Sequence, residues 1–277
     1  MSGNHDGIPA GVLSSLRREG LDTVERAFAY HGGADLDKPG LGHRRRTRLE
    51  IADDDGRTHV LYLKRYGPER IVSALRRWVR HGRLASAARV EFENIRRARA
   101  AGVATMRAVH CGEEPCPIGA KRSFLVVTSV PGEALERCFE GFLARHRAGG
   151  RVADVTRRLA RLVRTLHDAG YVHCDLYASH VFLDDSADTP RLHLIDLARM
   201  FRPSLRRRRW YVKDLAQLKY SMPPAWVAGS WQAFLAEYFP GVSAPAVRRF
   251  DRSVDRKVAS IRRRAERRRS RARGARP

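Results

Sequence analysis

Cysteine, acidic residues and long apolar runs are all scarce in this 277-residue sequence. The four cysteines are few for the length, and Cys111 and Cys116 have no matching second pair, so neither a disulfide framework nor a structural zinc site is expected. No run of about 18 apolar residues occurs, which argues against a transmembrane helix. Met1 to Gly11 lack the basic and apolar segments of a signal peptide. These absences favour a reduced, cytosolic protein.

Acidic residues are outnumbered, because 54 Lys and Arg stand against 30 Asp and Glu and give a formal net charge of +24. Such a chain attracts polyanions, among them nucleic acid, anionic lipid and phosphorylated sugars. A codon usage that favours arginine explains part of this excess equally well, so the charge alone does not choose among these partners. We find no recognisable nucleic-acid-binding motif, and a specific nucleic-acid partner is therefore not expected.

Apolar residues make up 43% of the chain, enough for a full core or for two lobes. The Asp-Gly of Asp53-Asp54-Asp55-Gly56 predicts a hairpin turn, because it accepts positive φ. The expected strands are Thr47 to Ile51, His59 to Lys64, Val103 to Val109 and Phe124 to Thr128. Helical patterns cover 12–30, 69–80, 84–101, 134–147, 151–169 and the region from Val212 onward.

Strands with one or two helices, followed by a mainly helical half, predict an α+β protein with two lobes rather than alternating βαβ units. The break Val130-Pro131-Gly132 is a natural hinge between the lobes. The nine arginines from Arg262 to Arg276 predict a frayed helix or disorder at the end of the chain. The expected parts are a helical N-terminal extension (1–30), a small β-rich lobe (31–130), a mainly helical lobe (131–255) and an Arg-rich tail (256–277).

The stretch from His173 to Leu183, followed by Leu194-Ile195-Asp196-Leu197, has the residue order of a kinase active site. Asp175 falls in a loop after a helical pattern, where a carboxylate can orient an attacking hydroxyl. Asp196 ends the second short strand and is expected to bind Mg²⁺ on the phosphates of ATP. His180 stands where protein kinases carry asparagine, the second metal ligand. Since Mg²⁺ prefers oxygen and histidine suits Mn²⁺ better, direct ligation and a packing role are both open.

Lys64 ends an apolar strand, a position that in kinases reaches the α- and β-phosphates of ATP. A carboxylate from the next main helix is expected to pair with it. Glu91 and Glu93 are the two candidates, and Glu91 is favoured.

Two departures from protein kinases bear on the substrate. Cys174 replaces the arginine that would pair with an activation-loop phosphate, so that mode of control is expected to be missing. Only 18 positions separate Asp196 from Asp214 and no Ala-Pro-Glu triplet intervenes, so a long peptide-docking segment does not fit. The pattern favours a non-protein substrate. Asp214 is expected to brace the catalytic loop by accepting its backbone N–H groups.

At these residues the chain resembles the lipopolysaccharide kinases of the Kdo/WaaP family, a branch of the protein-kinase-like fold. The resemblance spans about residues 40–225 and is carried by His173 to His180, Leu194 to Leu197, Arg209 to Leu215, Glu91 to Asn94 and Gly102 to Thr105. It implies ATP-dependent phosphorylation of a sugar hydroxyl, heptose or Kdo, in the inner core of lipopolysaccharide. The reaction would occur at the cytoplasmic face of the inner membrane, where the enzyme would be peripheral.

The resemblance also implies roles by position. Lys64 and Glu91 would position ATP, Asp175 would be the catalytic base, and Asp196 would hold the metal with His180 as a second candidate. Gly40 and Gly42, and Thr128 and Val130 before the hinge, are further candidates for nucleotide contacts. Arg45 stands where the third glycine of a G-x-G-x-x-G loop would be.

Two other functions are open at this stage. A small-molecule phosphotransferase of the aminoglycoside or choline type shares the short segment after Asp196, although the positive charge disfavours cationic aminoglycosides. A non-catalytic pseudokinase or basic scaffold is opposed by the presence of Lys64, Asp175 and Asp196. The expected partners are a glycolipid or sugar and an anionic membrane surface, while the oligomeric state is unknown. The candidates for lipid or phosphate contacts are Arg76, Arg77, Arg80, Arg83, Arg206 to Arg209 and the C-terminal arginine run.

Overall fold

The computed structural model of the chain describes residues 10–36, 44–68, 71–81, 85–116, 119–146 and 150–274. The chain forms two compact units. Unit 1 comprises residues 1–100, 105–130 and 196–201, and unit 2 comprises residues 101–104, 131–195 and 202–277. The short segment 196–201 therefore belongs to unit 1, although the strand that precedes it belongs to unit 2.

Unit 1 is built on an antiparallel sheet with the strand order β1-β2-β3-β5-β4. Its strands are β1 (Ala34–Asp35), β2 (Arg44–Ala52), β3 (Thr58–Tyr66), β4 (Ala108–Cys116) and β5 (Gly119–Thr128). The predicted hairpin turn joins β2 to β3: Gly56 has φ 76°, and its N–H donates to the Asp53 carbonyl at 3.0 Å. The positive φ explains why the turn has glycine at this position.

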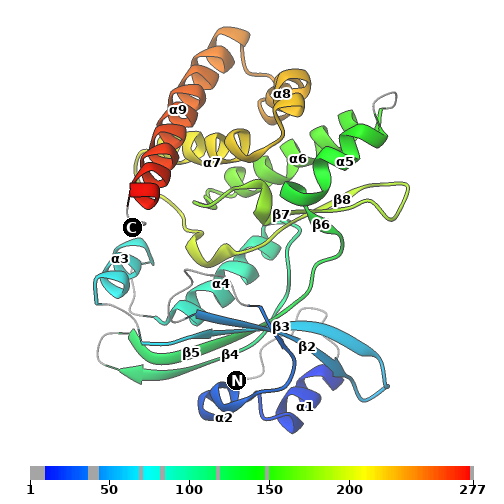
Figure 1. Cartoon of the computed structure of the whole chain (residues 1–277), viewed down its shortest axis with the longest axis vertical. Coiled ribbons are helices and arrows are strands. Elements are labelled where there is room, and N and C mark those ends of the chain that lie inside the picture. The colour runs from blue at the N-terminus through cyan, green and yellow to red at the C-terminus, as the bar shows by residue number, and fades with distance from the viewer. Residues whose placement is uncertain are drawn as a thin grey trace. The chain divides into compact units, whose positions relative to one another are not determined.

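Helices cover both faces of this sheet (Figure 1). The helices of unit 1 are α1 (Ala10–Arg18), α2 (Val24–Ala29), α3 (Ile71–His81) and α4 (Ala87–Ala100). Val12, Leu16 and Val24 of α1 and α2 pack into one core with the sheet residues Leu49 and Phe124. The described part of the expected N-terminal extension is thus built into unit 1.

The prediction of one helix over 12–30 is wrong, because the chain turns between α1 and α2. Gly20 has φ 75°, and Leu21 donates its N–H back to the Leu16 carbonyl, which closes α1. The Thr23 hydroxyl then caps α2 by accepting from the Arg26 N–H at 3.4 Å.

The prediction of a strand over Val103 to Val109 is also wrong, since β4 begins at Ala108. Val103 and Met106 are buried, but they lie in an irregular connection that follows α4. The strand itself continues through Glu113 and Glu114, which carry little strand propensity. Glu114 is stabilised there by a cross-strand ion pair with Arg122 of β5 at 2.8 Å.

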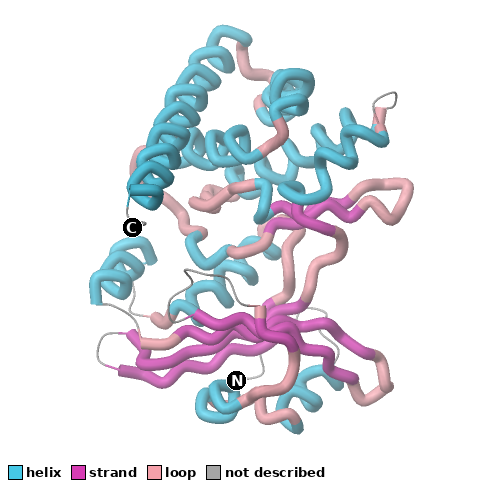
Figure 2. The backbone as a smooth tube through the Cα atoms, viewed as in Figure 1, coloured by secondary structure: helices cyan, strands magenta, loops and turns pink. Residues whose placement is uncertain are grey.

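Unit 2 is mainly helical, as Figure 2 shows by its predominance of helix over strand. Its helices are α5 (Leu135–Arg145), α6 (Arg151–Asp168), α7 (Arg207–Ser221), α8 (Pro224–Tyr238) and α9 (Ala244–Gly274). A small sheet of order β6-β7-β8 consists of β6 (Glu133–Ala134), β7 (Val181–Asp184) and β8 (Arg191–Leu194). The antiparallel sheet of unit 1 and the helices of unit 2 confirm the predicted α+β class.

The Arg-rich segment beyond residue 255 forms the end of the last helix, in keeping with the helical pattern predicted from Val212 onward. α9 runs without a break to Gly274. Its first half is held by the buried side chains of Phe250, Val254 and Val258, and the arginines that follow are good helix formers. α7 begins earlier than predicted, at Arg207 rather than Val212.

Candidate active site

Lys64 of β3 forms a buried ion pair with Glu91 of α4. Its Nζ donates to Glu91 Oε1 at 2.5 Å, and Glu91 is fully buried. The Tyr66 hydroxyl donates to the other oxygen of Glu91, also at 2.5 Å. Glu93, the less favoured candidate, instead pairs with Arg97 one turn along the helix. The structure thus brings together the lysine and the glutamate that the sequence favoured.

Asp196 lies on the same side of unit 1. It has φ 58° and ψ 59°, the left-handed region that is uncommon for residues other than glycine. Arg46 Nη2 donates to Asp196 Oδ2 at 3.2 Å, and Arg46 is the direct register partner of Lys64 on the neighbouring strand. Since opposed residues of antiparallel strands share a face, Arg46 aligns the Asp196 carboxylate with the Lys64 face of the sheet.

Asn94 fixes the segment that follows Asp196. It lies three residues after Glu91 and therefore on the same face of α4. Its amide donates to the carbonyls of Leu197 at 2.9 Å and Met200 at 2.8 Å, which hold the short 3₁₀ turn η2 (Leu197–Arg199). One helix thereby positions both the Glu91 carboxylate and the turn behind Asp196.

In unit 2, Asp175 follows a backbone that is clamped by Asp214. The fully buried Asp214 carboxylate accepts from the His173 N–H at 2.7 Å and from the Cys174 N–H at 2.9 Å. Lys213 donates from Nζ to the Cys174 carbonyl. Both backbone polar groups of Cys174 are thus engaged, which stabilises its left-handed conformation at φ 70°. The prediction that Asp214 braces this loop is confirmed.

A second layer of hydrogen bonds holds Asp214 itself. His167 of α6 donates from Nε2 to Asp214 Oδ2 at 3.3 Å, and its Nδ1 accepts from the Tyr238 hydroxyl at 2.6 Å. Burial raises the pKa of Tyr238, so that its hydroxyl keeps the proton it donates. The clamp is therefore anchored to two further helices of unit 2.

The two histidines of the loop have defined tautomers. His173 Nδ1 accepts from the Asp175 N–H at 3.3 Å, so its Nε2 carries the proton that is donated to the Ile195 carbonyl at 3.0 Å. His180, in the 3₁₀ turn η1 (Ala178–His180), must donate from Nδ1 to the Asp175 carbonyl at 2.7 Å. In the neutral ring, the lone pair of His180 is then on Nε2, the nitrogen that could ligate a metal.

The donor set fits a metal that is held mainly by phosphate. Among the described residues, no group of three or more His, Cys, Asp or Glu side chains could hold a metal ion by itself. Mg²⁺ in kinase sites takes one or two protein carboxylates, with the other ligands from substrate phosphates and water. Asp196 suits that role, and the Nε2 lone pair of His180 is a nitrogen donor that suits Mn²⁺.

Of the four other candidates for nucleotide contacts, two lie in the described part of the chain. Thr128 ends β5, and its hydroxyl accepts from the Arg107 N–H at 2.9 Å. Val130 is half-buried at the last position of unit 1 before the chain enters unit 2. Gly40 and Gly42 lie outside the described residues.

Sequence reasoning missed four residues of this arrangement, Arg46, Asn94, His167 and Lys213, as functional positions. Asn94 and Lys213 lie within the stretches that carry the family resemblance, Glu91 to Asn94 and Arg209 to Leu215, and this is the one signal that the sequence holds for them. Arg46 and His167 contact residues 150 and 47 positions away, and such contacts leave no local pattern.

The sheet with its buried Lys64–Glu91 pair and the helical unit with its clamped Asp175 loop define a protein-kinase-like fold. A family model places the chain further: the model of the lipopolysaccharide kinase (Kdo/WaaP) family matches residues 40–238. The chain belongs to this family.

Two relatives agree with this assignment. The chain is 37% identical over 139 residues to the lipopolysaccharide core heptose(I) kinase WaaP of Pseudomonas aeruginosa, a match over 48% of the chain and 52% of that protein. The match thus spans about half the length of this curated relative. A solved structure of WaaP in complex with acyl carrier protein superposes with a TM-score of 0.63 at 28% identity, covering 88% of the chain and 91% of that structure.

Proposed function

We propose that the chain is an ATP-dependent kinase that phosphorylates a sugar hydroxyl, heptose or Kdo, of the lipopolysaccharide core or of a related glycolipid. The observation that carries the proposal is the buried Lys64–Glu91 pair on the β3 strand and the following helix. A protein that served only as a basic scaffold would have no need of a desolvated ion pair at this position. Family membership and the name of the P. aeruginosa relative supply the sugar.

Lys64 and Glu91 would position ATP. The Lys64 ammonium is held by Glu91 rather than by solvent, so its direction is set before the nucleotide binds. A preorganised cation of this kind stabilises the α- and β-phosphates without a further loss of side-chain entropy. Thr128, Val130, Gly40 and Gly42 belong to the same proposal as contacts to the nucleotide.

Asp196 would be the principal protein ligand of Mg²⁺, and His180 the second candidate. The ion, when bound, neutralises charge on the transferred phosphate. Arg46 would steady the Asp196 carboxylate, and Asn94 the turn behind it. The protein would thus contribute an oriented Asp196 carboxylate, held through the hydrogen bonds of Arg46 and Asn94, all of which lie within unit 1.

Asp175 would accept a hydrogen bond from the attacking sugar hydroxyl and receive its proton as the bond to phosphorus forms. Its backbone cannot rotate freely, because Asp214, Lys213 and His180 hold the peptide groups on both sides of it. Orientation of the hydroxyl is the larger part of what such an aspartate contributes to phosphoryl transfer.

Phosphate transfer from labelled ATP to purified core glycolipid tests the proposal. Asp175→Ala should reduce the rate by several orders of magnitude while the Kd for Mg·ATP stays close to the wild-type value. Asp168→Ala is a matched control, since Asp168 is an exposed carboxylate at the end of α6. Transfer to choline or an aminoglycoside instead of core glycolipid would establish the alternative small-molecule phosphotransferase. Wild-type protein that binds no Mg·ATP would refute all kinase readings.

We also propose peripheral binding of an anionic membrane, which is consistent with a glycolipid substrate at the inner face of the inner membrane. None of the described helices has the length and apolar character needed to cross a bilayer. α3, however, exposes Val72, Leu75, Trp78 and Val79, which lie 47–72% exposed along one side of the helix. Exposed Arg80 adds positive charge to the same helix, as in amphipathic helices that lie in the membrane interface.

Flotation with liposomes that contain anionic lipid tests this proposal. Val79→Glu places a carboxylate on the apolar side of α3 and should abolish flotation at low salt. Val242→Glu, an exposed valine of unit 2, is the matched control and should float like the wild type. Equal flotation of the two variants would show that α3 is not the membrane contact.

The solved relative in complex with acyl carrier protein suggests a further partner. We propose that this chain also binds an acyl carrier protein, supported by similarity over 88% of its length. Co-purification of the two proteins after co-expression tests it. A chain that elutes without acyl carrier protein at low salt would contradict it.

A further inference from the structure

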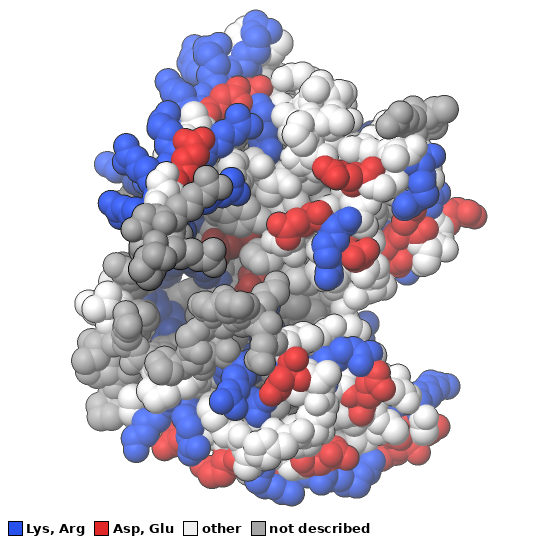
Figure 3. Space-filling model, in the orientation of Figure 1, with Lys and Arg blue, Asp and Glu red and all other residues white. Residues whose placement is uncertain are grey.

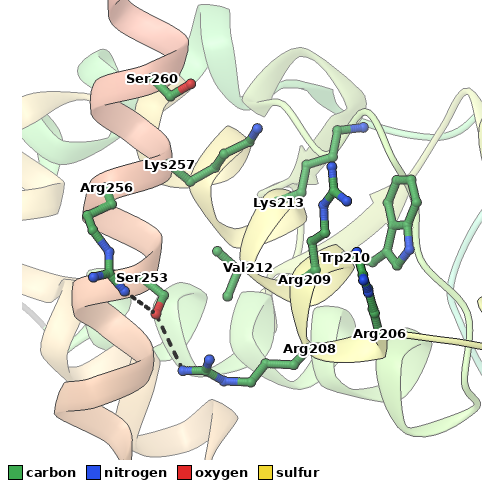
Figure 4. A pocket seen from close by; sticks show the side chains of 10 residues that line it. All are labelled: Arg206, Arg208, Arg209, Trp210, Val212, Lys213, Ser253, Arg256, Lys257 and Ser260. Carbon is green, nitrogen blue, oxygen red and sulfur yellow. Dashed lines mark hydrogen bonds between the residues drawn. The ribbon is translucent and has the colours of Figure 1, made fainter.

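A cavity of about 600 Å³ opens between α7 and α9 of unit 2 (Figure 4). Residues of α7 form one wall and residues of α9 form the other, with Lys257 pointing from α9 into the space toward the α7 side chains. Its volume lies in the range that accommodates a sugar-sized ligand. The residues that line it are Arg206, Arg208, Arg209, Trp210, Val212, Lys213, Ser253, Arg256, Lys257 and Ser260.

The side chains that line this cavity carry positive charge, and no carboxylate among the described lining residues balances it. Six of its ten residues are Arg or Lys, and none of the described lining residues is acidic. Figure 3 shows how Lys and Arg also gather over α9, with only a few carboxylates among them. Clustered like charges destabilise a fold unless an anion binds among them.

Three of the cations have no ion-pair partner within the described ranges, namely Arg206, Arg209 and Lys257. Burial lowers the pKa of Lys257, and the nearby positive charges of Arg264, Lys213 and Arg209 lower it further, two of which line the cavity with it. Two other cations are only weakly engaged, since Arg208 and Arg256 both donate to the Ser253 hydroxyl, at 3.4 and 3.2 Å. A bound oxyanion would therefore find several donors whose charge is not satisfied.

The backbone adds to the positive potential in the cavity. Arg206 precedes the first residue of α7 and has φ 53° and ψ 39°, a left-handed conformation. Cys174 and Asp196 are the other two non-glycine residues with positive φ in the described parts of the chain, and both belong to the kinase machinery. The side chain of Arg206 makes no capping hydrogen bond, and the positive end of the α7 dipole adds to the Arg206 side of the cavity.

Lys213 links the cavity to the loop of Asp175. Its ammonium lies over the Trp210 ring at 5.7 Å and donates to the Cys174 carbonyl, one residue before Asp175. The next residue of α7, Asp214, holds the N–H groups of the same loop. Lys213 therefore both lines the cavity and contacts the loop that carries the proposed catalytic base.

We propose that this cavity binds an oxyanion group, a phosphate or a carboxylate, carried by the acceptor glycolipid. The proposal rests on the kinase function proposed above and adds to it a requirement that the acceptor itself be anionic. Binding of that group among Arg206, Arg209 and Lys257 would anchor the acceptor in unit 2 next to the loop that carries Asp175.

The first arm of the test measures anion binding alone, by calorimetric titration of the full chain with inorganic phosphate. The pocket variant Arg209→Gln with Lys257→Gln should weaken phosphate binding at least tenfold. The control variant Arg248→Gln with Arg252→Gln removes the same charge from exposed positions of α9 that do not line the cavity, and it should bind like the wild type. Because the pocket variant relieves repulsion, its melting temperature should not fall, so a loss of binding is not a loss of fold.

The second arm measures phosphorylation of core glycolipid. The pocket variant should raise the KM for the glycolipid at least tenfold and leave the Kd for Mg·ATP unchanged, and inorganic phosphate should compete with the glycolipid in the wild type. Phosphate binding that is equal in wild type and pocket variant would overturn the site. Weakened phosphate binding with an unchanged KM would overturn its assignment to the acceptor and make it a site for free anions. A wild type that phosphorylates no glycolipid would refute the proposed function, and the first arm would then decide on its own whether the cavity binds anions.

Discussion

Breaking the Lys64–Glu91 pair is predicted to destabilise unit 1 far more than removing both of its charges. Glu91 is fully buried and the Lys64 side chain is 10% exposed, so water cannot replace a lost partner. Glu91→Gln keeps the shape of the side chain but leaves the Lys64 ammonium without a counter-charge. Removing one partner of such a pair costs about 3–5 kcal/mol.

The double variant Lys64→Met with Glu91→Leu removes both charges and fills a similar volume. Replacement of a whole buried pair by apolar side chains is close to neutral in stability. One cost stays, because Tyr66 loses the acceptor of its hydroxyl at 2.5 Å, a hydrogen bond that contributes about 1 kcal/mol. The single variants Lys64→Met and Glu91→Leu close the double-mutant cycle, and the coupling energy between positions 64 and 91 should be about 3 kcal/mol or larger. The double variant should fold without transferring phosphate.

Hydrogen exchange of the full chain, read on peptides from β3 and α4, measures this effect. The method reports local opening of unit 1 and does not require the two units to unfold together. Glu93→Gln is the matched control, since Glu93 pairs with the half-exposed Arg97 on the same helix, where such pairs contribute about 0–1 kcal/mol. A cost below about 1 kcal/mol for Glu91→Gln would refute the view that the pair is desolvated. A double variant as unstable as the single one would refute the coupling.

Three further outcomes follow from the structure. Asp214→Asn should lower kcat/KM about 10- to 100-fold, because an amide NH₂ would face one of the two loop N–H groups, and unchanged steady-state rates would contradict the clamp. Burial lowers the pKa of His110, so the unfolded chain protonates first as the pH falls below about 6.5. Its contribution to the free energy of unfolding is then lost toward acid by at most about 1.4 kcal/mol per pH unit. Urea titrations at several pH values should show that the unfolding free energy of His110→Gln falls less steeply toward acid than that of the wild type. Burial raises the pKa of Cys111 to about 11. Iodoacetamide at pH 8 should therefore alkylate it roughly 100-fold more slowly than an ordinary thiol, and peptide mass spectrometry that found ordinary labelling would disagree.

The residues that the sequence identified at the site share one property, a fixed distance from the end of a helix or strand. Gly102 and Gly170 have φ 80° and 81°, and each ends the helix before it where the sequence indicated. Glu91 and Asp175 can be counted from those two glycines. Lys64 follows in the same way from the Asp-Gly turn before β3.

Arg46 and Asn94 could not be found by such counting. Arg46 reaches Asp196 only because β2 pairs with β3 in the register that opposes Arg46 and Lys64. Asn94 reaches Leu197 and Met200 only because the segment after β8 lies against α4. These contacts depend on the packed unit, and the spacing of residues along the sequence does not predict them.

The errors in the fold arose where side-chain contacts outweighed local preference. Val103 to Met106 has the apolar, β-branched composition of a strand, yet its side chains are buried while the backbone forms an irregular connection. The true strand contains Glu114 and Pro115, at a point where its register against β5 shifts. Ion pairs of Glu114 with Arg122 and Lys121 stabilise this end of the hairpin, a cross-strand effect that periodicity cannot detect.

Helix α7 connects the two proposals for unit 2. Arg206 just before it and Arg209 of its first turn line the cavity, and Lys213 and Asp214 at the end of its second turn contact the loop of Asp175. Groups of this one helix contact both left-handed residues, since the Arg209 N–H donates to the Arg206 carbonyl, and Asp214 and Lys213 bond the peptide groups of Cys174. If the cavity takes an anion of the acceptor, α7 fixes the distance from that anion to the proposed base. Selection of the hydroxyl to be phosphorylated would then follow from where the acceptor carries its charge, and moving that charge by one sugar should change the site of phosphorylation rather than the rate alone.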